Sequence, residues 1–168
     1  INASLQNETA AKANGTKPAC LLDSAIYHYP GTGTYVTKTK TVNAYNPFYS
    51  PSTRLIYNRT SLSYSWTPSS KTDMIYSNQE KLLSEVQQQF SNSIWINNSK
   101  TTYTYDIHNN PSSKILSFWN QQTNAWKTVS KNSYTYTANN SLVNELSQTV
   151  DQVTGLYLNS SRYTYTND

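Results

Sequence analysis

The chain has 168 residues, enough for one domain, with 13 basic and 9 acidic residues and a formal net charge of +4. Disordered chains are poor in aromatic residues, whereas this one has 15 tyrosines, and its single cysteine excludes a disulfide framework and a cysteine-based metal site. No run of about 20 apolar residues predicts a transmembrane helix, and the basic residues are too dispersed along the chain to indicate a nucleic-acid-binding protein.

The first segment, residues 1–19, almost lacks apolar anchors and is expected to form a flexible leader or linker. The chain begins with Ile1 and not with methionine, which fits either a processed terminus or a fragment boundary. Next, Asp23-Ser24-Ala25 fits a pattern for bacterial O-glycosylation, in which Asp is followed by Ser or Thr and then by a small apolar residue. Ser24 is therefore a candidate glycosylation site, and the alternative is that Asp23 and Ser24 simply begin a strand.

From residue 20 to residue 168, tyrosines recur with a period of about thirty residues. Five of them stand 31, 29, 31 and 29 residues apart: Tyr45, Tyr76, Tyr105, Tyr136 and Tyr165. Two strands of about ten residues, with their turns, account for such a period. The sequence therefore predicts five β-hairpin units, at about 21–46, 52–78, 79–106, 110–137 and 141–166.

Clusters of Gly, Pro, Asn, Asp and Ser mark the expected turns, because these residues supply conformations that strands do not. Turns within the units are expected at 30–33, 67–70, 91–93, 120–124 and 151–155. Turns between units are expected at 46–52, 77–80, 108–112 and 138–141. The predicted fold is all-β, an antiparallel meander of about ten strands in one twisted or curled sheet.

The stretch TTYTYDIHNN, residues 101–110, places Tyr103 and Tyr105 two residues apart, and the pattern returns as Tyr134/Tyr136 and Tyr163/Tyr165. In a strand, residues i and i+2 point to the same face. Neighbouring units therefore align their tyrosines into a ladder across the sheet. Each ring can bury part of its area while its hydroxyl stays near water, so we interpret the ladder as architecture.

A second aromatic set lies near the turns within the units and includes Phe90 with Trp95 and Trp119 with Trp126. Trp119 and Trp126 flank one loop and are expected to face each other as a stabilising cross-strand pair. The alternative is an exposed aromatic row that stacks on sugar rings. In that case Trp95, Trp119 and Trp126 are the candidate binding residues.

Titratable residues form no pattern typical of catalysis. His28 and His108 stand beside predicted turns, the acids are scattered one per segment, and no helix-borne metal-binding or triad motif occurs. We therefore expect no catalytic residues, no metal site and no cofactor.

The stretch TTYTYDIHNNPSSKIL, 101–116, resembles the YD repeat of the RHS-type family. It is more similar still to a tyrosine-rich hairpin variant in secreted and surface proteins of Bacteroidetes-type bacteria, which FWNQQTNAWKTVSKNSYTYT, 118–137, also fits. This chain departs from the family at His108-Asn109-Asn110, where glycine usually follows the aspartate, and Asp106 is replaced by threonine in the later units. The resemblance implies a repetitive β-scaffold exported to the cell surface or beyond, by the type IX route.

We therefore expect a non-catalytic exported protein that acts as a surface scaffold, stalk or adhesin segment, with surface glycans or surface proteins as partners. Two alternatives remain. One is a glycan-binding module that uses exposed aromatic residues. The other is a subunit of an extracellular filament that self-associates through its sheet edges.

Overall fold

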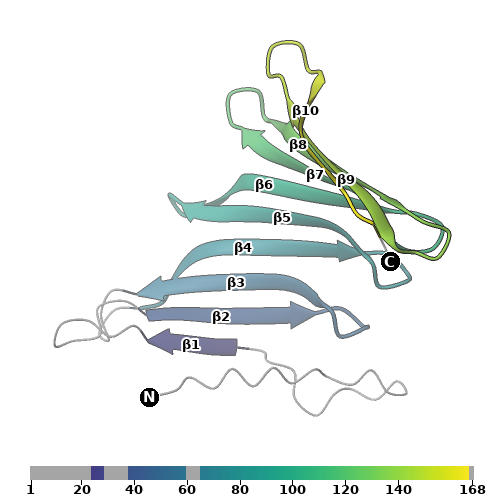
Figure 1. Cartoon of the computed structure of the whole chain (residues 1–168). Coiled ribbons are helices and arrows are strands. Elements are labelled where there is room, and N and C mark those ends of the chain that lie inside the picture. Colours follow the sequence, from purple (N-terminus) through teal and green to yellow (C-terminus); the bar gives the residue numbers. More distant parts are fainter. Residues whose placement is uncertain (1–23, 29–37, 60–64, 167–168) are drawn as a thin grey trace.

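The computed structural model describes residues 24–28, 38–59 and 65–166, so the predicted leader at 1–19 and the predicted turn at 30–33 lie outside the described residues. Ten strands form a single antiparallel sheet in chain order, which confirms the predicted all-β meander (Figure 1). The strands are β1 Ser24–His28, β2 Lys38–Tyr45, β3 Pro51–Arg59, β4 Thr67–Tyr76, β5 Leu82–Ser91, β6 Ile94–Tyr105, β7 Pro111–Asn120, β8 Ala125–Tyr136, β9 Leu142–Val150 and β10 Tyr157–Thr164.

The sheet is one layer thick. None of the described hydrophobic residues is buried, and the buried residues are four serines, Ser84, Ser99, Ser113 and Ser117. Three of these serines bond across to a neighbouring strand, as Ser113 does to Thr104 at 2.7 Å between hydroxyl oxygens. Most strand residues are therefore half-buried, and the sheet has two faces but no core.

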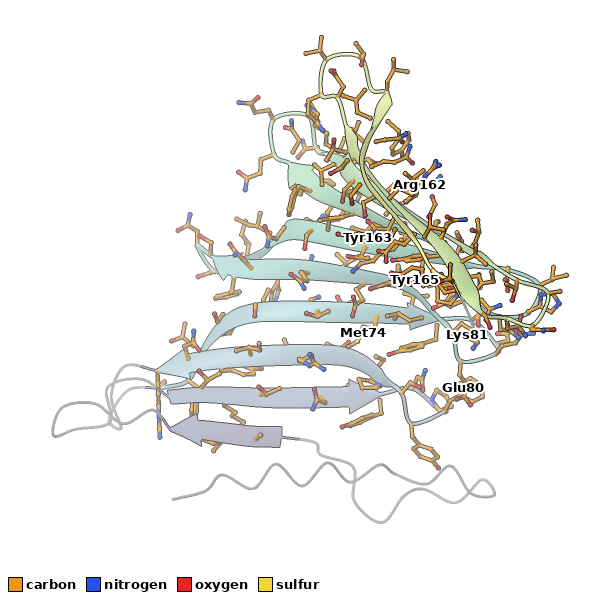
Figure 2. All side chains as sticks on the ribbon, viewed as in Figure 1. Met74, Glu80, Lys81, Arg162, Tyr163 and Tyr165 are labelled. Atoms are coloured by element: carbon orange, nitrogen blue, oxygen red, sulfur yellow. The ribbon has the colours of Figure 1, made fainter. Side chains whose placement is uncertain are left out.

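The strand register assigns each residue to one of these faces, because residues directly opposite each other point the same way. We call the face that carries Tyr103 face A, and the face that carries Trp126 face B. Tyr163 lies opposite Glu145 on face A, whereas Arg162 lies opposite Leu146 on face B. These neighbours on β10, labelled in Figure 2, therefore point to opposite sides of the sheet.

The four turns between hairpins share one geometry. In the turn Asp106–Asn110, Asp106 N–H donates to the Asn110 carbonyl at 2.9 Å, and Asn109 N–H donates to the Asp106 carbonyl at 3.0 Å. The same two bonds close the turns that begin at Asn46, Ser77 and Thr137. The fourth residue of each turn has positive φ, at Tyr49, Glu80, Asn109 and Asn140. This is a type I turn followed by a left-handed residue, a common connection in hairpins.

The first residue of each turn accepts hydrogen bonds from the backbone of the turn. Asp106 Oδ1 accepts from His108 N–H and Asn110 N–H, and Asn46 Oδ1 accepts from the corresponding donors, Phe48 and Ser50. The hydroxyls at the other two positions accept from the same backbone. Aspartate, asparagine, serine and threonine can all do this, which explains why the aspartate of the YD pattern is replaceable here.

At the opposite end of the strands, the hairpin tips differ in length. Asn92 and Ser93 both have positive φ and form a two-residue tip between β5 and β6, whereas residues 151–156 form the longer tip between β9 and β10. Each of the four complete hairpins has one extra residue in its second strand, at Ser69, Asn98, Val129 and Ser160. These β-bulges shift the alternation of side chains along each strand.

The prediction of a turn at 67–70 is wrong, because these residues lie within β4. Pro68 pairs with Tyr57 immediately beside the bulge at Ser69. A bulge locally interrupts the ladder of hydrogen bonds, so a proline without an N–H is tolerated there. The predicted turns at 46–52 and 108–112 are also too long, since β3 and β7 begin at Pro51 and Pro111.

Replacing Tyr136 by Ala is expected to lower the free energy of unfolding by about 2 kcal/mol, because a half-buried ring loses part of the contact that a core aromatic residue makes. Tyr165 follows the last strand and is 41% exposed, so Tyr165→Ala should cost clearly less. Urea melts of both variants measure the difference. A larger loss for Tyr165→Ala would contradict the stabilising role of the ladder.

Replacing Asp106 by Ala should lower the denaturation midpoint, because two backbone N–H groups lose their acceptor. Asp106→Asn is the matched control and should stay close to the parent, since Asn46 already holds its turn this way. Partial desolvation acts to raise the pKa of Asp106, but hydrogen bonds from Asn110 and His108 outweigh it and lower that pKa. The contribution is therefore present above about pH 4 and is lost as pH falls through the lowered pKa, a loss that Asp106→Asn should not show.

Candidate binding face

Aromatic residues are segregated between the two faces. The tyrosines of the ladder lie on face A, toward the turns between hairpins. All four tryptophans of the chain, Trp66, Trp95, Trp119 and Trp126, lie on face B toward the hairpin tips. Tyr57, Phe90 and Tyr157 share this part of face B. We call these seven residues the tryptophan row.

Two members of the row pair as the sequence predicted. Trp119 and Trp126 lie directly opposite each other, with ring centroids 5.0 Å apart and ring planes at 69°. Phe90 and Trp95 form a similar edge-to-face pair at 5.1 Å. Such geometry is the preferred one for aromatic pairs and stabilises the hairpin tips. The three residues proposed for binding, Trp95, Trp119 and Trp126, therefore lie on one face.

The candidate glycosylation site, Ser24, is the first residue of β1.

Cations accompany the row. The Arg59 guanidinium lies 4.4 Å from the ring centroid of Trp66. The ammonium groups of Lys71 and Lys131 lie 5.7 Å from the rings of Trp95 and Tyr157. These distances are within cation–π range, so three of the cations of face B lie against rings of the tryptophan row.

The register also divides the charges unequally. Among strand residues with described side chains, face B carries one acidic residue, Asp73, and six basic residues: Lys40, Arg59, Lys71, Lys100, Lys131 and Arg162. Asp73 is bound by Lys71 at 2.8 Å. Face B therefore has a formal excess of five positive charges. The basic residues are far apart along the chain, so the sequence alone does not predict this concentration.

Face A, in contrast, is nearly balanced. Its charges at the level of the tyrosines alternate in sign from one odd-numbered strand to the next. They are Arg54 on β3, Glu85 on β5, Lys114 on β7 and Glu145 on β9. The Tyr103 hydroxyl donates to Glu85 at 3.0 Å. Lys127 adds one further positive charge, so the formal excess among the described strand residues of this face is one. Lys81, just before β5, adds a cation beside the Tyr105 ring at 5.9 Å.

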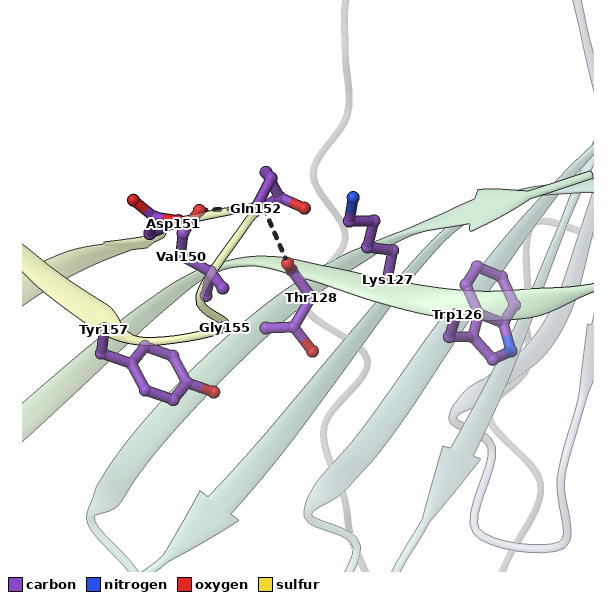
Figure 3. Close-up of a pocket in the computed structure, with 8 residues that line it drawn as sticks. All are labelled: Trp126, Lys127, Thr128, Val150, Asp151, Gln152, Gly155 and Tyr157. Carbon is purple, nitrogen blue, oxygen red and sulfur yellow. Dashed lines mark hydrogen bonds between the residues drawn. The ribbon is translucent and has the colours of Figure 1, made fainter. Parts of the chain in front are cut away.

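A shallow open hollow of about 340 Å³ lies where β8 diverges from the tip between β9 and β10. Trp126 and Tyr157 line it from face B, and Lys127 lines it from the other side (Figure 3). Gln152 closes one wall by donating to the Thr128 carbonyl at 3.2 Å. Tyr157 is 44% exposed, so its ring is accessible from solvent.

Among the described titratable groups, burial and structural contacts explain the shifted pKa values. The shifted groups are tyrosines of the ladder and two aspartates that cap turns, Asp106 and Asp151. Within the described residues, His, Cys, Asp and Glu form no group that could hold a metal ion. The same part of the chain contains no helix long and apolar enough to cross a membrane.

No family model matches the chain, and no curated protein matches it. The fold is similar to that of a protein of unknown function from Bacteroides fragilis NCTC 9343, with a TM-score of 0.64 and 14% identity over 76% of this chain and 91% of that chain. A DUF3836 family protein from Bacteroides vulgatus ATCC 8482 gives a TM-score of 0.49 and 20% identity over 56% of this chain and 96% of that chain. At these identities the likeness shows the fold alone.

The hydroxyl of Tyr103 is expected to lose its proton at a higher pH than that of an ordinary tyrosine. Desolvation raises its pKa to about 12, and the hydrogen bond to Glu85 and the charge of Glu85 act in the same direction. Because the folded-state pKa is raised, the stabilisation is complete below about pH 10 and is lost as pH rises toward 12. NMR titration of ¹³Cζ-labelled tyrosine should show Glu85→Gln lowering this pKa. Glu145→Gln is the matched control, because Glu145 contacts Tyr134 and not Tyr103. An unchanged Tyr103 in Glu85→Gln would contradict the assignment.

Proposed function

We propose that the chain is a non-catalytic, exported structural module that works as a surface scaffold, stalk or adhesin segment. The observation that carries this proposal is the single-layer sheet, in which hairpins follow one another in chain order and no described hydrophobic residue is buried. Each strand pairs only with its sequence neighbours, so the sheet has the serial construction of repeat proteins, which build length and surface from small units.

The contacts of the titratable groups support the same proposal. Asp106 and Asp151 cap turns, and Glu85 accepts a hydrogen bond from Tyr103. Catalytic sites bring such groups together and tune them against each other. Here each group serves the hairpin to which it belongs. Export by the type IX route rests on the resemblance of residues 101–116 and 118–137 to tyrosine-rich surface repeats.

A second candidate function is a glycan-binding module, favoured by one observation. The hollow beside Trp126 is lined by two aromatic side chains and by the polar residues Asp151 and Gln152. Aromatic rings with a few placed polar groups are the usual lining of a small-ligand site. A glycan array separates the two candidates. Saturable binding of one sugar, abolished by Trp126→Ala in a folded protein, would favour the glycan-binding module over the scaffold.

The scaffold proposal predicts that one complete hairpin can be removed. Deleting residues 107–137 joins Asp106 to Ala138, so Asp106 takes the place of Thr137 as the capping residue and Asn140 keeps the left-handed position. The shortened protein should retain a cooperative β-structured melt. Its longest dimension in small-angle scattering should fall by up to about 10 Å, the spacing of two strands.

The control deletion removes residues 107–120, a single strand. In the shortened chain β8 can pair with β6 only end for end, with Trp126 brought to the Tyr105 end of β6, so the side-chain pairs of both strands are lost and this variant should be clearly less stable than the complete-hairpin deletion. Failure of the complete-hairpin deletion to fold would show that the hairpins are not serial units and would overturn the scaffold proposal.

Protease treatment of intact cells tests the location, since a surface scaffold is cleaved without lysis.

A further inference from the structure

We infer that face B binds single-stranded nucleic acid, with the backbone phosphates on its basic residues and the bases on the tryptophan row. The inference does not rest on the scaffold proposal. The dispersed basic residues predict no nucleic-acid binding from sequence, but among the strand side chains that the structure describes the register gathers six of them on one face against a single acidic residue. Charge concentrated on one face is the electrostatic footprint of a nucleic-acid-binding protein.

The stoichiometry of face B favours nucleic acid over other polyanions. A single strand offers one negative charge for each flat aromatic base, and face B offers six cations on the same surface as the seven rings of the tryptophan row, three of them in contact with a ring. Proteins that bind single strands without sequence preference combine these same two elements, a positive track and stacking rings. A sulfated polysaccharide requires the cations but has no bases for the rings. The rings therefore decide between the two polymers.

The shape of the sheet selects a flexible polymer. Each strand is rotated by about 20 to 25° against its neighbour in a twisted sheet, which over ten strands gives roughly 200°. Figure 1 shows β8 to β10 turned well away from the plane of β2 to β5. A single strand can follow such a surface across several hairpins. A flat bilayer touches only a few strands of it, and a stiff duplex follows it only at a cost in bending energy.

A second copy of the chain is a poor occupant of face B. Face B carries an excess of five positive charges and face A an excess of one, so stacking face B on either face brings like charges together. Face A, moreover, satisfies its own charges through alternating signs and through contacts such as Tyr103 with Glu85. The excess charge of face B thus calls for an anionic partner.

The test is binding of a fluorescein-labelled oligothymidylate, followed by anisotropy and by quenching of intrinsic tryptophan fluorescence. Because every tryptophan lies on face B, binding there quenches the emission, whereas binding on face A leaves it nearly unchanged. We expect saturable binding at low salt that weakens linearly on a log–log plot against salt. A duplex of the same length should bind more weakly and quench less.

Two matched double variants place the site. Lys100→Gln with Lys131→Gln removes two charges from face B, and Arg54→Gln with Lys114→Gln removes two charges from face A. The face B pair should reduce the salt slope by about two, one for each lost phosphate contact, and the face A pair should leave it unchanged. Equal effects of the two pairs would mean attraction to net charge alone and would overturn the inference.

Ring variants test the stacking. Trp126→Leu should weaken oligothymidylate binding roughly tenfold, and Tyr157→Leu serves as a second variant if the loss of the Trp119 contact unfolds the tip. A sulfated polysaccharide and anionic phospholipid vesicles are the competing partners. The inference fails if oligothymidylate does not bind, if neither ring variant weakens binding, or if polysaccharide or vesicles bind more tightly than the oligonucleotide.

Discussion

The fold depends on main-chain pairing between consecutive strands, because the described part of the chain forms no second layer to support the sheet. A typical domain packs two layers around a core, but here the described part of the chain buries no hydrophobic side chain. The stabilisation must therefore come from the hydrogen-bonded ladder and from side-chain pairs that span it. Such pairs contribute modest energies individually, so the fold requires many of them in register. The edge-to-face pairs Phe90–Trp95 and Trp119–Trp126 and the bond from Tyr103 to Glu85 all have this form.

The need for register explains the turns between hairpins. A slip of one residue would move every side chain of a strand to the other face, so each turn must fix the pairing on both sides of it. The backbone bonds at Asn46, Ser77, Asp106 and Thr137 do so with one geometry, and the side chain of the same residue accepts from the turn. Each turn needs a side chain at this position that accepts hydrogen bonds, and it does not need one particular residue. Four different residue types therefore occupy the position.

The sequence predicted the strand count, the order of strands and the tyrosine ladder, because alternation and turn residues are local signals. It predicted the Trp119–Trp126 pair because the two residues are symmetric about one loop. It did not predict the charge asymmetry, because the basic residues are far apart along the chain and the β-bulges shift the alternation of faces between them. Lys127 and Lys131 are four residues apart, so simple alternation would place them on one face. The bulge at Val129 lies between them and sends them to opposite faces. A bulge leaves little trace in composition, so face assignments beyond it require the structure.

The two faces solve different problems with the same alternation. Face A places a charge of alternating sign on β3, β5, β7 and β9 and sets tyrosines between them, so its electrostatic demands are met within the sheet. Face B, apart from Asp73, repeats one sign and stabilises some of its cations on aromatic rings, as Trp66 does for Arg59. An aromatic ring stabilises a cation without carrying a formal charge, so these contacts leave the positive charge of face B unneutralised. The repulsion among the cations of face B therefore opposes folding of the free protein. An anionic partner would relieve it, so the asymmetry has a stability cost in isolation and a gain on binding.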